Sequence, residues 1–235
     1  MTIKKVTIEV WSDVVCPFCL VGKKKLEQAI ESQNAQNHIE VIWRSFQLDP
    51  GFPQNESVPS MKNLTKRKGY PADQVVAMCG QLTASGKPYG IDFNFDNALT
   101  FNTSNAHRLI HWAKEYDKSN DLKEALMTAH FSLGKDLSSD TELASVAKSV
   151  GLDSTKATEL LASDKYAAEV AADINNAQKI GVRGVPFFLI DGKQGISGAQ
   201  SDAVFEDAIQ HILKDRSIVT GTSGAEVCSP DGECQ

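Results

Sequence analysis

The chain has 235 residues, of which 41% are hydrophobic and 23% charged, and its formal net charge at pH 7 is -6. These values are typical of an ordinary globular protein with one large domain, or with one domain that carries a second small one. The net negative charge argues against general nucleic-acid binding, which usually leaves a basic surface.

The first part of the chain alternates between strand and helix patterns. The period-two segment VTIEV (Val6–Val10) predicts a strand, and WSDVVCPFCLVGKKKLEQ then begins a helix that runs to about Ser32. The segment HIEVIWRSFQL (His38–Leu48) predicts a second strand. Strand, helix and strand at this spacing form a βαβ unit, so the two strands should be parallel with a right-handed crossover. We interpret the run Lys23–Lys25 as a solvated face of the helix.

The middle of the chain is predicted to be helical. A Pro-, Gly- and Ser-rich loop, PGFPQNESVPS, marks a boundary, and apolar residues at helical spacing follow it. The expected helices carry Val75 to Leu82, Ala106 to Tyr116, Leu122 to Leu133, Leu143 to Val150, Ser154 to Leu161 with Ser154 as the cap, and DKYAAEVAADINNAQKIG. Cys79 shares a face with Val75 and Leu82, so we expect a buried small apolar side chain there.

The last third returns to a strand pattern. VPFFLID (Val185–Asp191) predicts a buried strand, Asp191-Gly192 a hairpin turn, and KQGIS its second arm. An amphipathic helix with Val204 to Leu213 follows. The two outer parts supply four strands only together. We therefore expect an α/β domain from residues 1–59 and 171–216, an inserted helical domain at 60–170, and a flexible tail at 217–235.

Two cysteines lie at the predicted start of the first helix. Cys16 falls at its N-terminus and Pro17 at the first helical position, where a missing N–H costs nothing. Helix N-termini and Cys-x-x-Cys spacing favour the thiolate. Cys19, one turn later, can attack a mixed disulfide formed at Cys16. Phe18 between them is a plausible apolar contact for substrate.

Other uses of the cysteines have to be weighed. Pooling Cys16, Cys19, Cys228 and Cys234 would give a four-cysteine zinc site, but five residues rather than the usual two to four separate the second pair. An inert disulfide is a further alternative. The strand-to-helix location of the first pair favours redox chemistry over both.

The motifs together resemble a known family. CPFC after a strand, the helical insert, and GVRGVPFFLIDG followed by GISGAQ resemble the DsbA-like branch of the thioredoxin fold. The opening IEVWSDVVCPFCLVGK and the segment NTSNAHRLIHWA resemble the FrnE-like cytosolic oxidoreductases. The resemblance implies a central mixed sheet of about four strands flanked by helices, with an inserted all-helical domain. It also implies that Pro186 is a cis-proline facing the dithiol and that Val185 presents its backbone to an extended substrate.

The sequence allows more than one role for several further residues. Asp13 could cap the helix or form the turn before it, or act in proton transfer near Cys19. His107, within NAHRL, could face the active site or lie in the core, and Trp11 is expected in the core or its rim. In the DsbA-like branch the insert overhangs the dithiol. The aromatic side chains of PYGIDFNFDNALTF could therefore form core or line a substrate groove: Tyr89, Phe93, Phe95 and Phe101.

We therefore expect a cytoplasmic thiol–disulfide oxidoreductase acting on protein thiols and disulfides or on small thiols. It should need no metal or organic cofactor, although glutathione could serve as a thiol co-substrate, and it should have no nucleic-acid or membrane partner. No segment approaches the ~18 uninterrupted apolar residues of a membrane span. Cys228 and Cys234 bracket a turn signal, SPDGE, and are a candidate second redox pair.

Two other classes of function remain open at this stage. The first is a glutathione-dependent enzyme similar to 2-hydroxychromene-2-carboxylate isomerases or kappa-class glutathione transferases, in which we would expect serine at the position of Cys16. The second is a binding protein, either a four-cysteine zinc module or a polypeptide-holding chaperone. A second cysteine at position 19 favours dithiol exchange over the first of these.

Overall fold

The computed structural model describes residues 5–220, with side chains described as far as residue 214. The predicted second pair, Cys228 and Cys234, therefore lies outside the described residues. Across the described part of the chain, no helix is long and apolar enough to cross a membrane.

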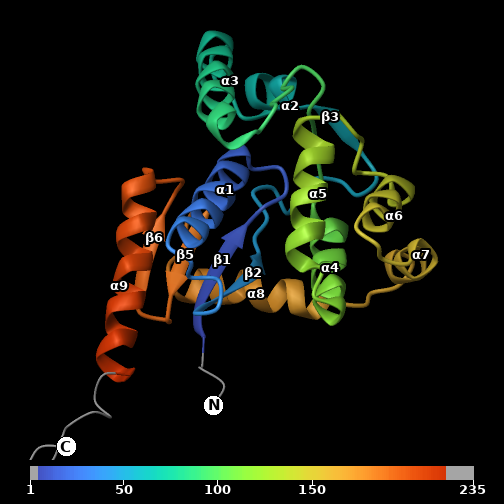
Figure 1. Cartoon of the computed structure of the whole chain (residues 1–235). Coiled ribbons are helices and arrows are strands. Elements are labelled where there is room, and N and C mark those ends of the chain that lie inside the picture. Colours follow the sequence, from blue (N-terminus) through green and yellow to red (C-terminus); the bar gives the residue numbers. More distant parts are fainter. Residues whose placement is uncertain (1–4, 221–235) are drawn as a thin grey trace, which may run out of the picture.

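A mixed four-stranded sheet forms the centre of the molecule (Figure 1). Its strands are β1 (Val6–Ser12), β2 (Ile39–Ser45), β5 (Phe187–Ile190) and β6 (Gln194–Ser197), in the spatial order β2-β1-β5-β6. Strand β1 is parallel to β2 and antiparallel to β5, which is antiparallel to β6. The predicted thioredoxin-like fold is thereby confirmed, and β1 lies between strands from both ends of the chain.

Helices cover both faces of this sheet. Helices α1 (Pro17–Ser32) and α9 (Asp202–Thr220) pack against each other on one face. There Ile8 and Val10 of β1 join the main apolar core. Helix α8 (Ala167–Lys179) covers the other face, where Trp11 is fully buried against Ala177. Successive residues of a strand point to opposite faces of the sheet, so the side chains of Val10 and Trp11 pack in apolar clusters on opposite faces.

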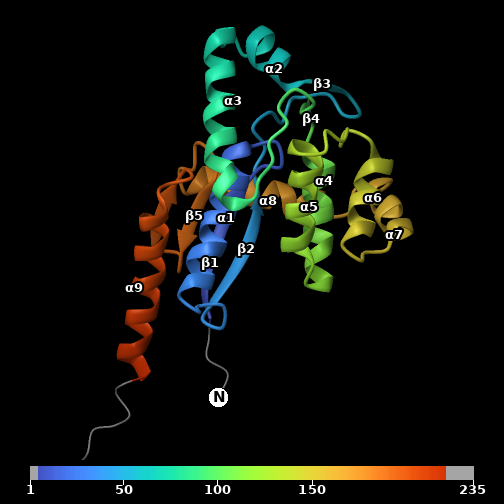
Figure 2. The ribbon, with the colours of Figure 1, turned by 45° about the horizontal axis from the view of Figure 1, so that its top comes forward.

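The remaining helices lie to one side of the sheet and above it (Figure 2). They are α2 (Ser60–Lys62), α3 (Ala72–Gly86), α4 (Ser104–Ala113), α5 (Ser119–Phe131), α6 (Asp140–Ser149) and α7 (Ser154–Leu161). Two strands that the sequence pattern does not reveal, β3 (Ser57–Pro59) and β4 (Leu99–Phe101), pair antiparallel beside them. Three residues are too few to show a period-two pattern, so this small sheet was missed.

The cap of α7 differs from the prediction by one residue. Asp153 is the N-cap, and its carboxylate accepts hydrogen bonds from the backbone N–H groups of Thr155 and Lys156. Ser154 is instead the first helical residue. Both residue types cap helices well, so sequence alone does not choose between neighbours.

Of the aromatic side chains before α4, Phe93 and Phe101 are buried in the core, and Tyr89 and Phe95 are partly buried and pack against it. Phe93 stacks on Phe95 with ring centroids 5.0 Å apart and meets Phe131 of α5 edge-on at 5.4 Å. Phe101 is 2% exposed. Tyr89 donates its hydroxyl to Asp202 of α9. The aromatic contacts stabilise the helical part, and the hydrogen bond of Tyr89 attaches it to α9.

The lysine run of α1 is not a solvated face, as the sequence suggested. Lys23 is 1% exposed, and its ammonium lies 2.6 Å from Glu27 and 2.5 Å from Glu124 of α5. Lys24 also contacts Glu124. A buried charge is tolerated when it is paired in this way. Glu124 lies 101 positions after Lys23 in the sequence, so the local pattern of α1 could not reveal it as a partner.

Candidate active site

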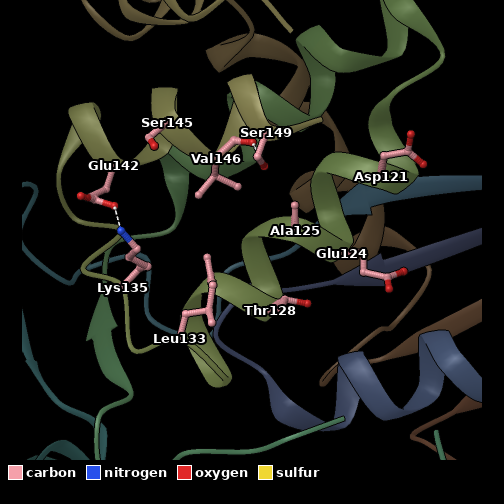
Figure 3. Close-up of a pocket in the computed structure, with 11 residues that line it drawn as sticks. Asp121, Glu124, Ala125, Thr128, Leu133, Lys135, Glu142, Ser145, Val146 and Ser149 are labelled. Carbon is pink, nitrogen blue, oxygen red and sulfur yellow. Dashed lines mark hydrogen bonds and ion pairs between the residues drawn. The ribbon is translucent and has the colours of Figure 1, made fainter. Parts of the chain in front are cut away.

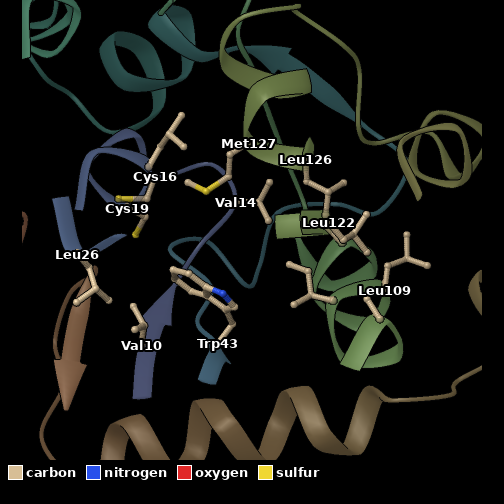
Figure 4. Close-up of a cluster of buried hydrophobic side chains, with 14 of the residues drawn as sticks. Val10, Val14, Cys16, Cys19, Leu26, Trp43, Leu109, Leu122, Leu126 and Met127 are labelled. Atoms are coloured by element: carbon tan, nitrogen blue, oxygen red, sulfur yellow. The ribbon is translucent and has the colours of Figure 1, made fainter. Parts of the chain in front are cut away.

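The two cysteines of CPFC lie where β1 gives way to α1, next to the apolar core (Figure 4). Cys16 is the N-cap residue, Pro17 occupies the first turn, and no side chain caps this end of the helix. Both thiols are free and buried, Cys16 being 4% and Cys19 1% exposed. Phe18 between them is 44% exposed. An exposed apolar ring thus lies between the two cysteines in the sequence.

A cis peptide bond faces this dithiol. The Val185–Pro186 bond is cis, as the resemblance implied. The Cys16 thiol lies 3.5 Å from the carbonyl oxygen of Val185, across 169 positions of sequence. Val185 is partly exposed and Pro186 is buried. The antiparallel pairing of β1 with β5 brings these two segments together.

Gly22 lets α1 approach the loop that carries the cis-proline. A methyl group at this position would lie 3.1 Å from Phe188 Cζ and 3.1 Å from Pro186 Cγ. Such contacts are closer than carbon atoms prefer, about 3.5–4.0 Å. The absence of a side chain at residue 22 therefore sets the distance between the dithiol helix and Pro186.

We expect Gly22→Ala to lower the free energy of unfolding by about 1–2 kcal/mol, because overpacking outweighs the gain in helix propensity. Gly80→Ala in α3 is the matched control, since a methyl group there meets no atom within 4 Å. It should raise stability by up to about 1 kcal/mol. Urea unfolding of the two variants measures the difference, and equal behaviour would contradict the packing argument.

The two thiols are hydrogen-bonded to each other, and their pKa values shift in opposite directions. Burial opposes ionisation of Cys19, but a hydrogen bond from Cys16, the charge of Lys123 and the hydroxyl of Ser12 together lower the pKa of Cys19. The same hydrogen bond with Cys19, together with burial, raises the pKa of Cys16. The pair therefore loses its first proton readily and its second reluctantly. The sequence predicted the thiolate on Cys16. Apart from burial, the opposite pKa directions arise first from the hydrogen bond between the two cysteines, and Lys123 adds a charge from outside the motif.

Asp13 does not cap α1. Its backbone carbonyl accepts from Cys16 N in a turn, whereas its carboxylate accepts from Leu48 N at 2.8 Å and lies 3.2 Å from His107 Nε2. The buried carboxyl has a lowered pKa: burial opposes this shift, and the contact with His107 outweighs it. Burial likewise lowers the pKa of His107, against the effect of Asp13. His107 thus faces the segment before the dithiol, joined to it by a hydrogen bond to a carboxylate.

The remaining predicted residues lie apart from the dithiol or in the core. Trp11 is 0% exposed and donates its indole N–H to the carbonyl of Asp173. Cys79 on α3 is only partly buried, contrary to expectation, because that helix buries few side chains. Burial and the charge of Asp96 raise the pKa of Cys79, so its thiol is less reactive than a free one.

A separate hollow of about 570 Å³ lies between α5 and α6 (Figure 3). Ala125, Leu133 and Val146 form its apolar part, and Lys135 pairs with Glu142 at its rim at 3.0 Å. None of its lining residues is a cysteine or histidine. The hollow therefore lacks a nucleophile of the kind that the dithiol provides.

Two residues near the dithiol escaped sequence reasoning. Lys123 of α5 is buried, and so is Ser12. A weak signal existed for the lysine, since Lys123, Met127 and His130 are spaced i, i+4, i+7 and share the buried side of α5. Over residues 5–214, no group of three or more His, Cys, Asp and Glu side chains is arranged to hold a metal ion.

A dithiol at the N-terminus of a helix, facing a cis-proline beside a four-stranded mixed sheet, defines a thioredoxin-fold protein with a candidate redox site. The family model described as DSBA-like thioredoxin domain matches residues 7–210, and the chain belongs to that family.

Individual relatives agree with this assignment. The protein YwbO of Bacillus subtilis (strain 168) is 31% identical over 209 residues, which cover 87% of this chain and 96% of YwbO. A crystal structure described as a "probable DsbA oxidoreductase" from Streptomyces coelicolor is 33% identical, with a TM-score of 0.85 over 98% of this chain and 99% of that one. A 2-hydroxychromene-2-carboxylate isomerase shares the fold at 14% identity, with a TM-score of 0.69 over 91% of this chain and 98% of that one.

Proposed function

We propose that this protein is a thiol–disulfide oxidoreductase that exchanges disulfides with protein or small thiols through Cys16 and Cys19. The observation that carries the proposal is the placement of the Cys16 thiol 3.5 Å from the carbonyl oxygen of Val185, next to the cis peptide bond. Membership of the DsbA-like family supports it. We propose that the reaction needs no metal or organic cofactor, because the electrons stay on sulfur.

The first step forms a mixed disulfide at Cys16, the more exposed of the two cysteines. Transfer of the shared proton from Cys16 to Cys19 gives the Cys16 thiolate. This thiolate bonds to one sulfur of a substrate disulfide, and the other substrate sulfur leaves as a thiolate. Val185 offers its backbone, and Phe18 its exposed ring, to the chain on either side of the substrate sulfur.

The second step closes the protein disulfide. The first substrate thiolate takes up the proton of Cys19, which then attacks the Cys16 sulfur and releases the second substrate sulfur as a thiolate. Two electrons have then passed from the dithiol to the substrate. The reverse sequence oxidises a substrate dithiol by the same bonds. In that direction Cys19 leaves as a thiolate, and the charge of Lys123 stabilises it.

Trapping the mixed disulfide tests the proposal. In a Cys79→Ser, Cys228→Ser, Cys234→Ser background, Cys19→Ser should form a single stable adduct with oxidised glutathione at Cys16. Cys16→Ser should react at least tenfold more slowly, because Cys19 is 1% exposed, and the intact dithiol should form an internal disulfide instead. Mass mapping identifies the adduct site, and preferential modification of Cys19 would contradict these roles.

The same variants separate the rival function. A glutathione-dependent isomerisation or conjugation that survives Cys19→Ser would favour an enzyme of the isomerase or kappa transferase class. Two finer parts of the proposal rest on the sequence alone, namely the FrnE-like branch with its cytoplasmic location and electron exchange with Cys228 and Cys234. With that tail pair restored, Cys19→Ser should trap a disulfide between Cys16 and the tail, and its persistent absence would refute the exchange.

A further inference from the structure

Two lysines are buried in the described structure, and they differ in their partners. Lys23 and Lys123 are each 1% exposed. The ammonium of Lys23 lies between the carboxylates of Glu27 and Glu124. Lys123, next to Glu124 on α5, forms no ion pair with any side chain described through residue 214. A buried ammonium without a counter-charge is costly, so a group able to become anionic is expected beside it.

The surroundings of Lys123 place its charge beside the dithiol. Its Nζ donates to the carbonyl oxygen of Ser12 at 3.3 Å, at the end of β1 and four residues before Cys16. It also lies 5.7 Å from the centre of the Trp43 ring, which attracts a cation weakly. These contacts are to neutral groups. They hold the ammonium in place without compensating its charge.

The charged and titratable groups near Lys123 include its candidate counter-charges. They come from the β1–α1 segment, from α1 and from α4: Asp13, Cys16, Cys19, Lys23 and His107. Asp13 already accepts from Leu48 N and His107. Those hydrogen bonds do not remove the charge of the Asp13 carboxylate, so Asp13 and the dithiol are the two groups that can carry a compensating negative charge near Lys123. Burial lowers the pKa of Lys123 to about 8, against the opposing effect of Cys19, Asp13 and Cys16, so Lys123 is still mostly charged at pH 7.

We propose that Lys123 is a positioning residue for disulfide exchange. This inference rests on the proposed function. The ammonium of Lys123 is the counter-charge of the Cys16–Cys19 thiolate. The charge comes from the helical insert and not from the CPFC motif or its helix. Because α5 also binds α1 through Glu124, docking of the insert delivers the charge together with the contact that fixes the dithiol helix. The insert thereby sets the reactivity of the dithiol without touching substrate.

Charge-neutral replacements of Lys123 test this role. Lys123→Met keeps the length and apolar character of the side chain, and Lys123→Gln also keeps a donor for Ser12. In the Cys79→Ser, Cys228→Ser, Cys234→Ser background, both should raise the first thiol pKa by about one unit, measured from the pH dependence of iodoacetamide alkylation. Since the thiolate loses stabilisation, the equilibrium with glutathione should move about tenfold toward the protein disulfide, which corresponds to ~30 mV.

Lys118→Met, at the exposed N-terminus of the same helix, is the control and should change neither quantity. If either folded neutral variant keeps the wild-type pKa and the wild-type glutathione equilibrium, the role of Lys123 is refuted. The alkylation measurement does not depend on catalysis of exchange. If the parent protein is alkylated at Cys16 but fails to exchange disulfides, the proposed function is refuted. The effect of Lys123 on the thiol pKa can still be measured in that case.

Discussion

Replacing Arg108 with methionine is expected to lower the free energy of unfolding by about 2–4 kcal/mol. Arg108 of α4 is 6% exposed. Its guanidinium donates to the carbonyl oxygens of Lys165 at 2.8 Å and Leu160 at 2.7 Å, and also to that of Ser163. A hydrogen bond to a charged group contributes about 1.5–3 kcal/mol, and the Leu160 carbonyl keeps its hydrogen bonds from Ser163 when the guanidinium is removed. Methionine keeps the apolar stem, so the loss reports on the hydrogen bonds.

This arginine joins α4, which carries His107, to the segment between α7 and α8. Urea unfolding followed by circular dichroism measures the effect. Arg183→Met, at an exposed position, is the control and should stay within about 0.5 kcal/mol of the wild type. An unchanged midpoint and slope for Arg108→Met would show that the carbonyls of Lys165 and Ser163 find other partners.

Acidification from pH 6.5 to pH 4 is expected to remove about 3 kcal/mol of stability through His130 alone. His130 is 1% exposed, its ring centre lies 4.3 Å from that of Phe131, and its Nδ1 has no hydrogen-bond partner within the described residues. Burial lowers the pKa of His130 to about 4. In the unfolded chain this histidine binds a proton near pH 6.5. Below that pH the unfolded state therefore holds more protons, and stability falls until the folded state is protonated too.

His130→Phe keeps an aromatic ring in place and should flatten the dependence of unfolding free energy on pH over this range. His211→Gln removes an exposed histidine and should leave the wild-type slope unchanged. The lowered pKa of His107 acts in the same direction, so the variant is expected to retain part of the slope. Equal slopes for His130→Phe and the wild type would rule out the contribution of His130.

The fold was largely predictable because its signals are local or strongly patterned. The period-two run VTIEV, the helix after Pro17 and the buried run before Asp191 each specify their own conformation, and the sheet follows from how such strands combine. Pro186 could be placed opposite the dithiol only through the family resemblance. Its cis geometry has no signature in local composition.

The charges around the dithiol could not be predicted in the same way. Asp13 meets His107 across 94 positions, and Lys123 meets Ser12 across 111. Lysine and aspartate usually lie at the surface. Asp13 was therefore interpreted as a cap, a turn residue or a group for proton transfer, and Lys123 was not singled out at all. Which of them becomes buried depends on where α4 and α5 dock, and that is decided by packing far from either residue in sequence.

The long separation between Cys16 and Val185 has a consequence for the protein as it is made. Ribosomes add about 5–20 residues per second, so the 169 positions between them correspond to about 10–30 s. During that interval the nascent chain already contains Cys16 and Cys19, but β5 has not been synthesised and one edge of β1 is unpaired. A growing chain in this state offers two thiols without the loop that would select their partners. Chaperones or reductants acting on the nascent chain would meet those thiols before any substrate does.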